Sequence, residues 1–322
     1  MGARTINSAT MTTTRRETVA SHLALIAVQI LFGTWPIVGK IALRALPSTA
    51  LVALRVCGAA IAFLILQHTI EGVQKIRKED YARLALYSLL GVVFNQLLFV
   101  KGLSLTTVVS ATLLGTTIPV FTLLVSIALG YDRVSRRKAF GILLAAGGVV
   151  YLVDPMHADY SHSTTVGNLL LVANSISYGA YIAISKDLLK RYGALTVITW
   201  IFIFGSVATI PFGALTLAAA PPGHVGPGIW LAVIYIILFP TVGAYYLNAW
   251  ALQRVAPSTV AAYIYLQPLI AFAFAPLILG EQWSSRTWVA CALIFTGVAV
   301  VTWRERSYAI EEVAEHPDAL SH

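Results

Sequence analysis

Polar and aromatic side chains recur at helical spacing inside long apolar runs of this sequence. One run carries Asn174, Ser177, Tyr178 and Tyr181, whose separations of three, four and seven positions place them on one face of an α-helix. Other runs carry shorter stripes of the same kind, namely Thr241, Tyr245 and Asn248; Ser88, Gly91 and Asn95; and Tyr263 with Gln267. A polar group that faces lipid is costly, so these faces should point into the protein.

These residue types could hold a small amphipathic solute. Aromatic faces would contact its apolar part, and amide or hydroxyl groups would orient its polar part. An interhelical hydrogen bond is the simpler interpretation of any one Tyr or Asn, whereas a shared cavity accounts better for the whole set. We predict a substrate-binding cavity lined by Trp35, Asn95, Tyr178, Tyr181, Tyr245, Asn248, Tyr263 and Gln267.

Two prolines, Pro119 and Pro268, lie inside apolar runs. A proline in a helix lacks its own N–H and frees the carbonyl four residues earlier, here that of Gly115 or Ile264. Broken helices near the bilayer midplane form the binding sites of many transporters built from repeats. A plain packing kink is the alternative, and the sequence leaves both interpretations open.

Few charged groups lie inside the apolar runs. All 14 Asp and Glu fall in loops, in tails or at run ends, so we expect transport without a proton-binding carboxylate in the pathway. Two cations, Lys40 and Arg55, do lie inside. They could attract a carboxylate or a phosphate, or bind helix C-terminal carbonyls; the structural role is favoured for Lys40, and Arg55 is left undecided.

Enzyme motifs are absent from the sequence: it has no HExxH, no GxSxG, no phosphate-binding loop and no Cys/His cluster. We expect no catalytic residue, no metal and no cofactor. The alternative from another class is an intramembrane or lipid-modifying enzyme that uses the loop acids Asp132 or Glu281. A structural role such as helix capping is the favoured interpretation of those acids, and the absence of charged rings argues against a pore.

The composition is that of an integral membrane protein. Hydrophobic residues make up 58% of the 322, charged residues only 11%, and the mean hydropathy is +0.78; soluble domains carry roughly 25% charged residues. A helix needs about 20 apolar residues to cross the hydrocarbon core. The apolar runs predict ten spans, near 21–44, 48–69, 83–102, 104–129, 137–153, 166–188, 195–218, 228–252, 256–279 and 287–303.

The chain repeats itself at a nearly constant offset. Pro268 lies 149 positions after Pro119, Gly297 lies 149 after Gly148, and Tyr181 lies 146 after Trp35. Each repeat holds five spans, an odd number, so the second repeat should enter the membrane from the opposite side. We predict an all-α membrane fold of two inverted five-helix repeats. Small residues at helical spacing in both fifth spans, such as Gly148 and Gly297, predict close helix packing there.

The net charge of +8 follows membrane topology and does not indicate nucleic-acid binding. With both termini in the cytoplasm, 17 of the 22 Lys and Arg fall in cytoplasmic segments and three fall outside. The expected organisation is a cytoplasmic tail (1–20), a first repeat (21–153), a second repeat (166–303) and a cytoplasmic tail (304–322). We expect a monomer or weak homo-oligomer in the cytoplasmic membrane, with the bilayer and a small-molecule substrate as partners.

Two motifs carry a resemblance to a known family. The first is FGTWPIVGK, followed by Leu54 and Arg55 in the next span, and the second is YYLNAWALQRVAPSTVAAYIYLQPLIAFAFAPLILGEQWS at 245–284. With these motifs in order and duplicated across roughly 20–303, the chain resembles the ten-span EamA-type permeases of the drug/metabolite transporter superfamily.

That resemblance implies a carrier of small solutes, usually an exporter of amino acids, other metabolites or toxic compounds. It implies a central cavity between the first, third, fourth, sixth, eighth and ninth spans. The family often has Glu before the proline of the ninth span, where this chain has Gln267, so cation antiport is less expected. We expect an alternating-access exporter of amino acids or similar neutral or zwitterionic amphipathic solutes. A carrier of drugs, cations or nucleotide sugars is the alternative within the superfamily.

Overall fold

Residues 8–72, 74–129, 136–153, 163–219, 225–254, 260, 263–280 and 284–302 are described by the computed structural model. Every regular element in them is a helix. Apolar runs of this length favour helices because a helix satisfies its own backbone hydrogen bonds where lipid offers none. The prediction of an all-helical membrane protein is confirmed for these residues.

Seven segments of the described chain are long and apolar enough to cross a bilayer, and each overlaps a predicted span. They are Val19–Ala42 within α1 (Ser8–Ala42); α2 (Ser48–Ile70); α3 (Asp80–Ser88) with η1 (Leu89–Phe94) and α4 (Asn95–Leu105); α5 (Val108–Gly115) with α6 (Ile118–Ala128); α8 (Ser163–Tyr192); α9 (Ala194–Ala219); and α10 (Pro227–Ile236) with η2 (Ile237–Gly243) and α11 (Ala244–Arg254).

Three further helices occupy the ranges of the other predicted spans. They are α7 (Arg136–Val153), α13 (Gln267–Leu279), which follows the 3₁₀ turn η3 (Ile264–Leu266), and α14 (Ser285–Thr302). The first helix differs from the prediction at its start, since it begins at Ser8 and not near residue 21. Polar Thr and Arg residues near the N-terminus are compatible with a helix that extends beyond the hydrocarbon, which an apolar-run criterion cannot detect.

Several spans are interrupted near their middles. Turn residues Thr116 and Thr117 separate α5 from α6, and η1 and η2 are π-helical segments, a rare form that is often associated with functional sites. The π-helical segments lie 148–149 positions apart, the same offset as the sequence repeat (89 to 237, 94 to 243). The two repeats therefore share an irregular backbone feature as well as sequence.

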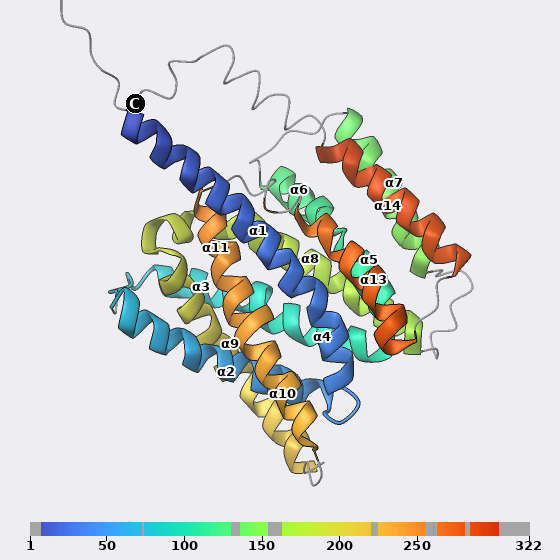
Figure 1. The fold of residues 1–322 in the computed structure, drawn as a ribbon, viewed down its shortest axis with the longest axis horizontal. Helices are drawn as coiled ribbons and strands as arrows, with labels where there is room; N and C mark the ends of the chain where they lie inside the picture. The colour runs from blue at the N-terminus through green and yellow to red at the C-terminus, as the bar shows by residue number, and fades with distance from the viewer. Residues whose placement is uncertain are drawn as a thin grey trace, which may run out of the picture.

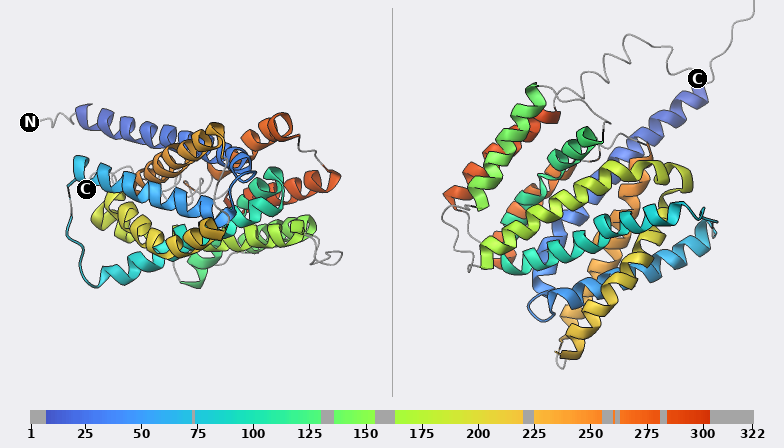
Figure 2. Two further views of the ribbon diagram at one scale, coloured as in Figure 1. Left: turned by 90° about the horizontal axis from the view of Figure 1, so that it is seen from below. Right: turned by 180° about the vertical axis from the view of Figure 1, so that it is seen from behind.

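The packing also follows the repeat. Helix α1 packs against α10, α11 and α13, and its counterpart α8 packs against α4, α5 and α6, the corresponding elements of the other repeat. Helix α2 packs on its counterpart α9, and α7 packs on its counterpart α14. Figure 1 and Figure 2 show α7 and α14 side by side at one edge, apart from the remaining helices. Hence α1 and α8 are the inner helices that can carry a central site.

Glycines permit the closest helix contacts. A Cβ on Gly297 of α14 would lie 2.4 Å from the backbone N of Ala145 in α7, and a Cβ on Gly148 would lie 2.7 Å from the Ile294 side chain. Because backbone cannot yield as a flexible side chain can, α7 and α14 need glycine here. The close packing predicted for these small residues is confirmed.

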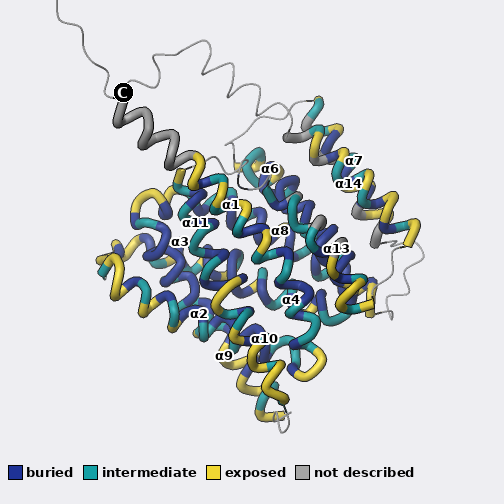
Figure 3. Tube along the Cα trace, in the orientation of Figure 1, coloured by how far each residue is buried: buried dark blue, intermediate teal, exposed yellow. Residues whose placement is uncertain are grey.

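Burial divides the bundle into a packed interior and an apolar exterior. Figure 3 shows buried positions concentrated on inward helix faces and exposed ones on the outer faces. Many exposed side chains are large and apolar, including Ile65, Leu215, Leu231 and Leu277. Contiguous exposed apolar surface of this kind suits contact with lipid.

Candidate functional site

A fully buried arginine, Arg55 of α2, lies at the centre of a polar cluster between the repeats. Its side chain is 1% exposed. The Nε donates to the Thr241 hydroxyl at 2.5 Å, one Nη donates to the Gln96 side-chain oxygen, and the other Nη points to the Pro240 carbonyl at 3.4 Å. These acceptors belong to α4 and η2, so the guanidinium connects α2 to the middles of two other spans.

An aromatic ring covers one face of this cation. The Arg55 Cζ lies 4.0 Å from the ring centroid of Trp35 in α1. Trp35 is itself buried and stacks against Phe99 of α4, with 6.1 Å between ring centroids. A desolvated cation–π contact contributes about 2 kcal/mol or more. Trp35, predicted as a cavity residue, thus contacts the charged centre of the cluster.

Gln96 of α4 joins the arginine to the other polar groups. Its side-chain nitrogen donates to the Tyr245 hydroxyl at 2.6 Å and to the Asn95 side-chain oxygen at 3.1 Å. The Tyr245 hydroxyl in turn lies 3.2 Å from that oxygen. Asn95 and Tyr245, both predicted as cavity residues, are therefore brought together with Arg55 through one glutamine.

Two polar residues of the α8 stripe hold the π-helical part of the third span. The Asn174 side chain donates to the backbone carbonyl of Asn95 at 2.7 Å, and the Ser177 hydroxyl donates to that of Leu90 at 2.8 Å. A π-helical segment lacks the regular i to i+4 pattern, so neighbouring side chains can satisfy its carbonyls. The side chains of these two residues form interhelical hydrogen bonds. This was the simpler interpretation of single polar residues in the sequence.

The two tyrosines of the α8 stripe are aromatic neighbours of the cluster. The rings of Tyr178 and Tyr181 lie 5.7 Å apart, and both residues are buried. A Cβ on Gly91 of η1 would lie 2.7 Å from the Tyr181 ring, so this ring packs directly on the irregular segment.

Asn248 lies on the same face of α11 as Tyr245, three positions later. It is 7% exposed. Within the described part of the chain, neither the Asn248 amide nor the Tyr178 hydroxyl has a hydrogen-bond partner. Both groups can therefore donate a hydrogen bond to a bound solute.

The last two predicted cavity residues, Tyr263 and Gln267, contact a different part of α1. The Gln267 side chain donates to the Gln29 side chain at 2.6 Å, and the Tyr263 hydroxyl lies 2.7 Å from Nδ1 of His22. Gln29 is six residues before Trp35, or about 9 Å by helical rise. The predicted site thus divides into the cluster around Arg55 and a separate row of contacts between α1 and the segment of η3 and α13.

The two prolines occupy matching places at helix starts. Pro119 is the second residue of α6 and Pro268 the second residue of α13. Near Pro119 the Leu114 carbonyl, at the end of α5, accepts the Ser175 hydroxyl of α8 at 3.1 Å. The side chain of Pro268 lies outside the described positions, and a gating role for either proline stays a prediction.

Comparison with known proteins identifies the family. The model of the EamA-like transporter family matches residues 19–153 and again 165–303. This chain belongs to the EamA-like transporter family. It is thus a membrane transporter of the drug/metabolite transporter superfamily, as its two motifs had indicated.

Curated relatives of this EamA-like transporter carry transporter names. They include an uncharacterized transporter, YetK, of Bacillus subtilis (24% identity, 90% of this chain and 89% of the relative) and a WAT1-related protein of Arabidopsis thaliana (26%, 95% and 88%). A probable terminal-alkyne amino-acid exporter of Streptantibioticus cattleyicolor is 27% identical over 72% of this chain and 77% of its own length. One solved crystal structure, 22% identical, shares the fold with a TM-score of 0.63, covering 89% of this chain and 98% of that one.

Charge is the unusual property of the cluster in this EamA-like transporter. An arginine near a span centre costs about 2.5–3.5 kcal/mol on insertion scales, and a buried charge is usually paired with an opposite one. Arg55 has neutral partners only among the described residues: a hydroxyl, an amide oxygen, a backbone carbonyl and an indole face. The cluster therefore keeps an excess positive charge inside the bundle.

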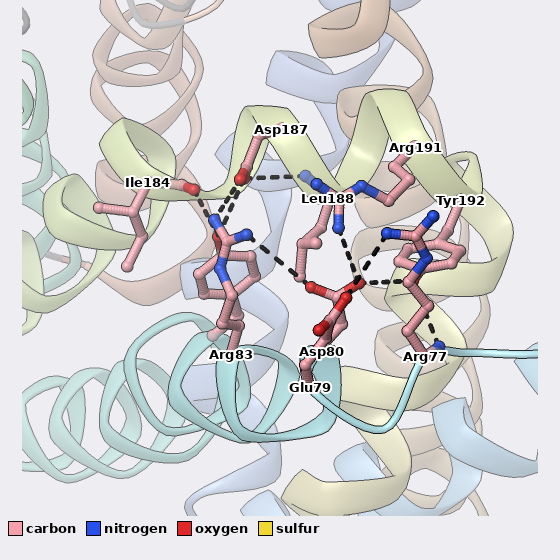
Figure 4. A network of polar contacts seen from close by, with 10 residues as sticks. Arg77, Glu79, Asp80, Arg83, Ile184, Asp187, Leu188, Arg191 and Tyr192 are labelled. Carbon is pink, nitrogen blue, oxygen red and sulfur yellow. Dashed lines mark hydrogen bonds and ion pairs between the residues drawn. The ribbon is translucent and has the colours of Figure 1, made fainter.

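A second polar network, at the ends of α3 and α8, is neutralised by carboxylates. Figure 4 shows Asp80 and Arg83 of α3 facing Asp187 and Arg191 of α8. Arg191 pairs with Asp80 at 2.8 Å, and Arg83 pairs with Asp187. Bonds from Tyr192 to Asp80 at 2.5 Å and from Tyr87 to Asp187 at 3.0 Å complete this end network. It fastens α3 of the EamA-like transporter to α8.

Lys40 has a third kind of environment. Its Nζ donates to the Leu103 carbonyl at 2.7 Å and to the Thr106 carbonyl, at the C-terminal end of α4. A cation at a helix C-terminus is favourably placed. A groove of about 280 Å³ lies beside it, lined by Lys40, Leu43, Arg44, Ser104 and Leu279, and shares no residue with the Arg55 cluster. This geometry agrees with the structural role favoured for Lys40.

Two residues of the site were missed by sequence reasoning. Gln96 lies off the stripe that contains Asn95, yet it bonds to both Arg55 and Tyr245. A usable signal was present, because Gln96 and Tyr245 are separated by 149, the offset of the repeat. Gln29 was missed for a different reason: it is one polar residue within an apolar run, without a stripe of its own. The loop acids Asp132 and Glu281 lie outside the described residues.

Proposed function

We propose that this chain exports amino acids or similar amphipathic solutes across the cytoplasmic membrane by alternating access. The supporting observation is the cluster itself: Arg55, Gln96 and Trp35 from the first repeat meet Thr241, Tyr245 and Tyr178 from the second. A site made by both repeats can be exposed to either side as the repeats move. The named amino-acid exporter among the relatives supports the same substrate class.

The proposed protein has ten spans in two inverted repeats, with both termini in the cytoplasm. The matched π-helical segments and matched packing of α1 and α8 support the repeat. The distribution of Lys and Arg supports the orientation. The positive centre and the Gln267 in place of an acid make a cationic substrate the less favoured option.

Transport is tested with purified protein in liposomes, by counterflow of labelled amino acids. Trp35→Ala and Tyr178→Ala should each lower exchange about tenfold or more, because they remove aromatic surface from the site. The matched controls are Trp230→Ala and Tyr151→Ala, which remove exposed rings of the same types. Normal exchange in both cluster variants, with every active solute, would refute the site.

Orientation is tested by labelling single cysteines with a membrane-impermeant maleimide in intact cells, after replacing Cys57 and Cys291. Lys101→Cys and Lys190→Cys are a matched pair, since both lysines are exposed at helix ends. The proposal predicts labelling at 101 from outside and at 190 only after the cells are opened. The reverse pattern would invert the topology.

A further inference from the structure

The charge of Arg55 has no opposite charge beside it among the described residues. The guanidinium has five N–H donors, and three acceptors are present, one of them at the long distance of 3.4 Å. The long bond is made by the Nη atom on the side of the guanidinium that faces the Pro240 carbonyl. A carboxylate accepts two parallel N–H bonds from such an edge.

We propose that Arg55 is a substrate-binding residue that recognises the carboxylate of the transported solute. This inference rests on the proposed export of small amphipathic solutes and narrows it to solutes that carry one carboxylate. The Tyr178 hydroxyl and the Asn248 amide make no hydrogen bond within the described chain, so they can donate to other polar groups of the solute.

Neutral partners suit such a role better than an acid would. Thr241, Gln96 and Trp35 hold the guanidinium in a fixed orientation without cancelling its charge. A protein carboxylate at the same place would compete with the solute for the cation. The Trp35 face also excludes water from one side, which strengthens the attraction for an anion.

The single positive charge of the cluster favours a solute group with one negative charge. A phosphate monoester carries about two negative charges at neutral pH, whereas the described cluster contains one cation. A carboxylate matches that single charge. The aromatic rings of Phe32, Tyr178, Tyr181 and Phe202 lie around the polar groups and suit a solute whose remaining part is apolar.

The test compares acids with analogues of similar shape that lack the carboxylate, on the wild-type protein. Phenylalanine is paired with phenylalaninol, and 3-phenylpropanoate with 3-phenylpropanamide. Binding is measured as the rise in melting temperature of the purified protein, and exchange is measured as competition with labelled phenylalanine in liposomes. We expect both acids to bind about tenfold or more tightly than the analogues without a carboxylate, since a site built for a polar group rejects the analogue that lacks it.

Substitutions of Arg55 then test whether this residue causes the preference for acids. Arg55→Gln should abolish the difference between each acid and its analogue without a carboxylate, and Arg55→Lys should retain part of it because the charge remains. The matched control is Arg254→Gln, which removes an exposed guanidinium stacked on Trp250 at 3.9 Å and should leave the preference unchanged. If Arg55→Gln does not fold, the wild-type comparison still decides.

The outcomes separate this inference from the proposed function. Equal binding of phenylalanine and phenylalaninol, with exchange intact, overturns the role of Arg55 and leaves amino-acid export standing. Selective binding of 3-phenylpropanoate with no exchange of any amino acid supports the carboxylate site and removes the amino-acid substrate. No binding of either acid overturns the inference.

Discussion

Two polar clusters of this transporter contain arginine, and the arginines of the two clusters have different partners. At the ends of α3 and α8, Arg83 and Arg191 face Asp187 and Asp80. In the interior, Arg55 faces only uncharged groups of the described chain, although burial makes a missing counter-ion more costly there. The end network therefore acts as a structural fastening, whereas the interior cation is the one that we propose to bind a ligand.

The location of each cluster fits this division. The end network joins two neighbouring spans at a position where water can reach it, since the Arg83 and Asp187 side chains are 43% and 47% exposed. The Arg55 cluster joins elements of both repeats at span middles. A change of state that moves one repeat against the other would alter the second cluster directly.

The largest loss of stability and of exchange is expected when the buried Arg55 loses a hydrogen-bond acceptor. Gln96→Leu should reduce stability by about 3–5 kcal/mol, because it leaves a buried charge poorly paired, and should abolish exchange. Gln253→Leu is the matched control, since it removes a bond to the Leu189 carbonyl and an exposed acceptor for Arg254 at 3.3 Å, and it should cost about 1 kcal/mol because no buried charge is left poorly paired. Thermal unfolding and counterflow measure the two effects, and equal losses in both variants would contradict the account.

Removing single tyrosine hydroxyls sharpens the comparison. Tyr245→Phe takes a bond from Gln96 in the interior, so it should lower stability by about 1 kcal/mol and weaken the preference for acids over analogues without a carboxylate. Tyr192→Phe takes a bond from Asp80 in the end network, so it should lower stability and leave that preference unchanged. A changed preference in Tyr192→Phe would mean that the end network also contacts the solute.

The smallest effect is expected for the exposed ion pair. Arg83→Gln, Asp187→Asn and their double variant should give a coupling free energy of about 0.2–1 kcal/mol, as for other exposed pairs. This coupling should shrink at high salt because solvent ions screen exposed charges. Coupling well above this range, or insensitive to salt, would show that the network is more than a fastening.

Much of the fold was predictable from the sequence, because apolar runs and a constant repeat offset can be read directly from the order of the residues. The offset that pairs Pro119 with Pro268 also places the starts of α6 and α13 149 residues apart. The π-helical segments were not predictable, because hydropathy does not distinguish an i to i+5 turn from a regular one.

The candidate site was only partly predictable. Helical stripes found Tyr178, Tyr245 and Asn95, whose faces follow from spacing alone. The stripes could not show that Tyr263 and Gln267 bind a different part of α1, nor that Gln96 reaches around its helix to Arg55. Those contacts depend on how helices from two repeats pack, which no local pattern encodes.

The most direct test of the account gives Arg55 an internal counter-ion. Gln96→Glu keeps the shape of the side chain and places a carboxylate where Gln96 now accepts from the guanidinium. Melting temperature is measured with and without phenylalanine and 3-phenylpropanoate, alongside counterflow. We predict a protein at least as stable as the wild type that no longer responds to either acid and no longer exchanges them. A Gln96→Glu protein that still binds and exchanges these acids as the wild type does would contradict the claim that Arg55 awaits a carboxylate from the solute.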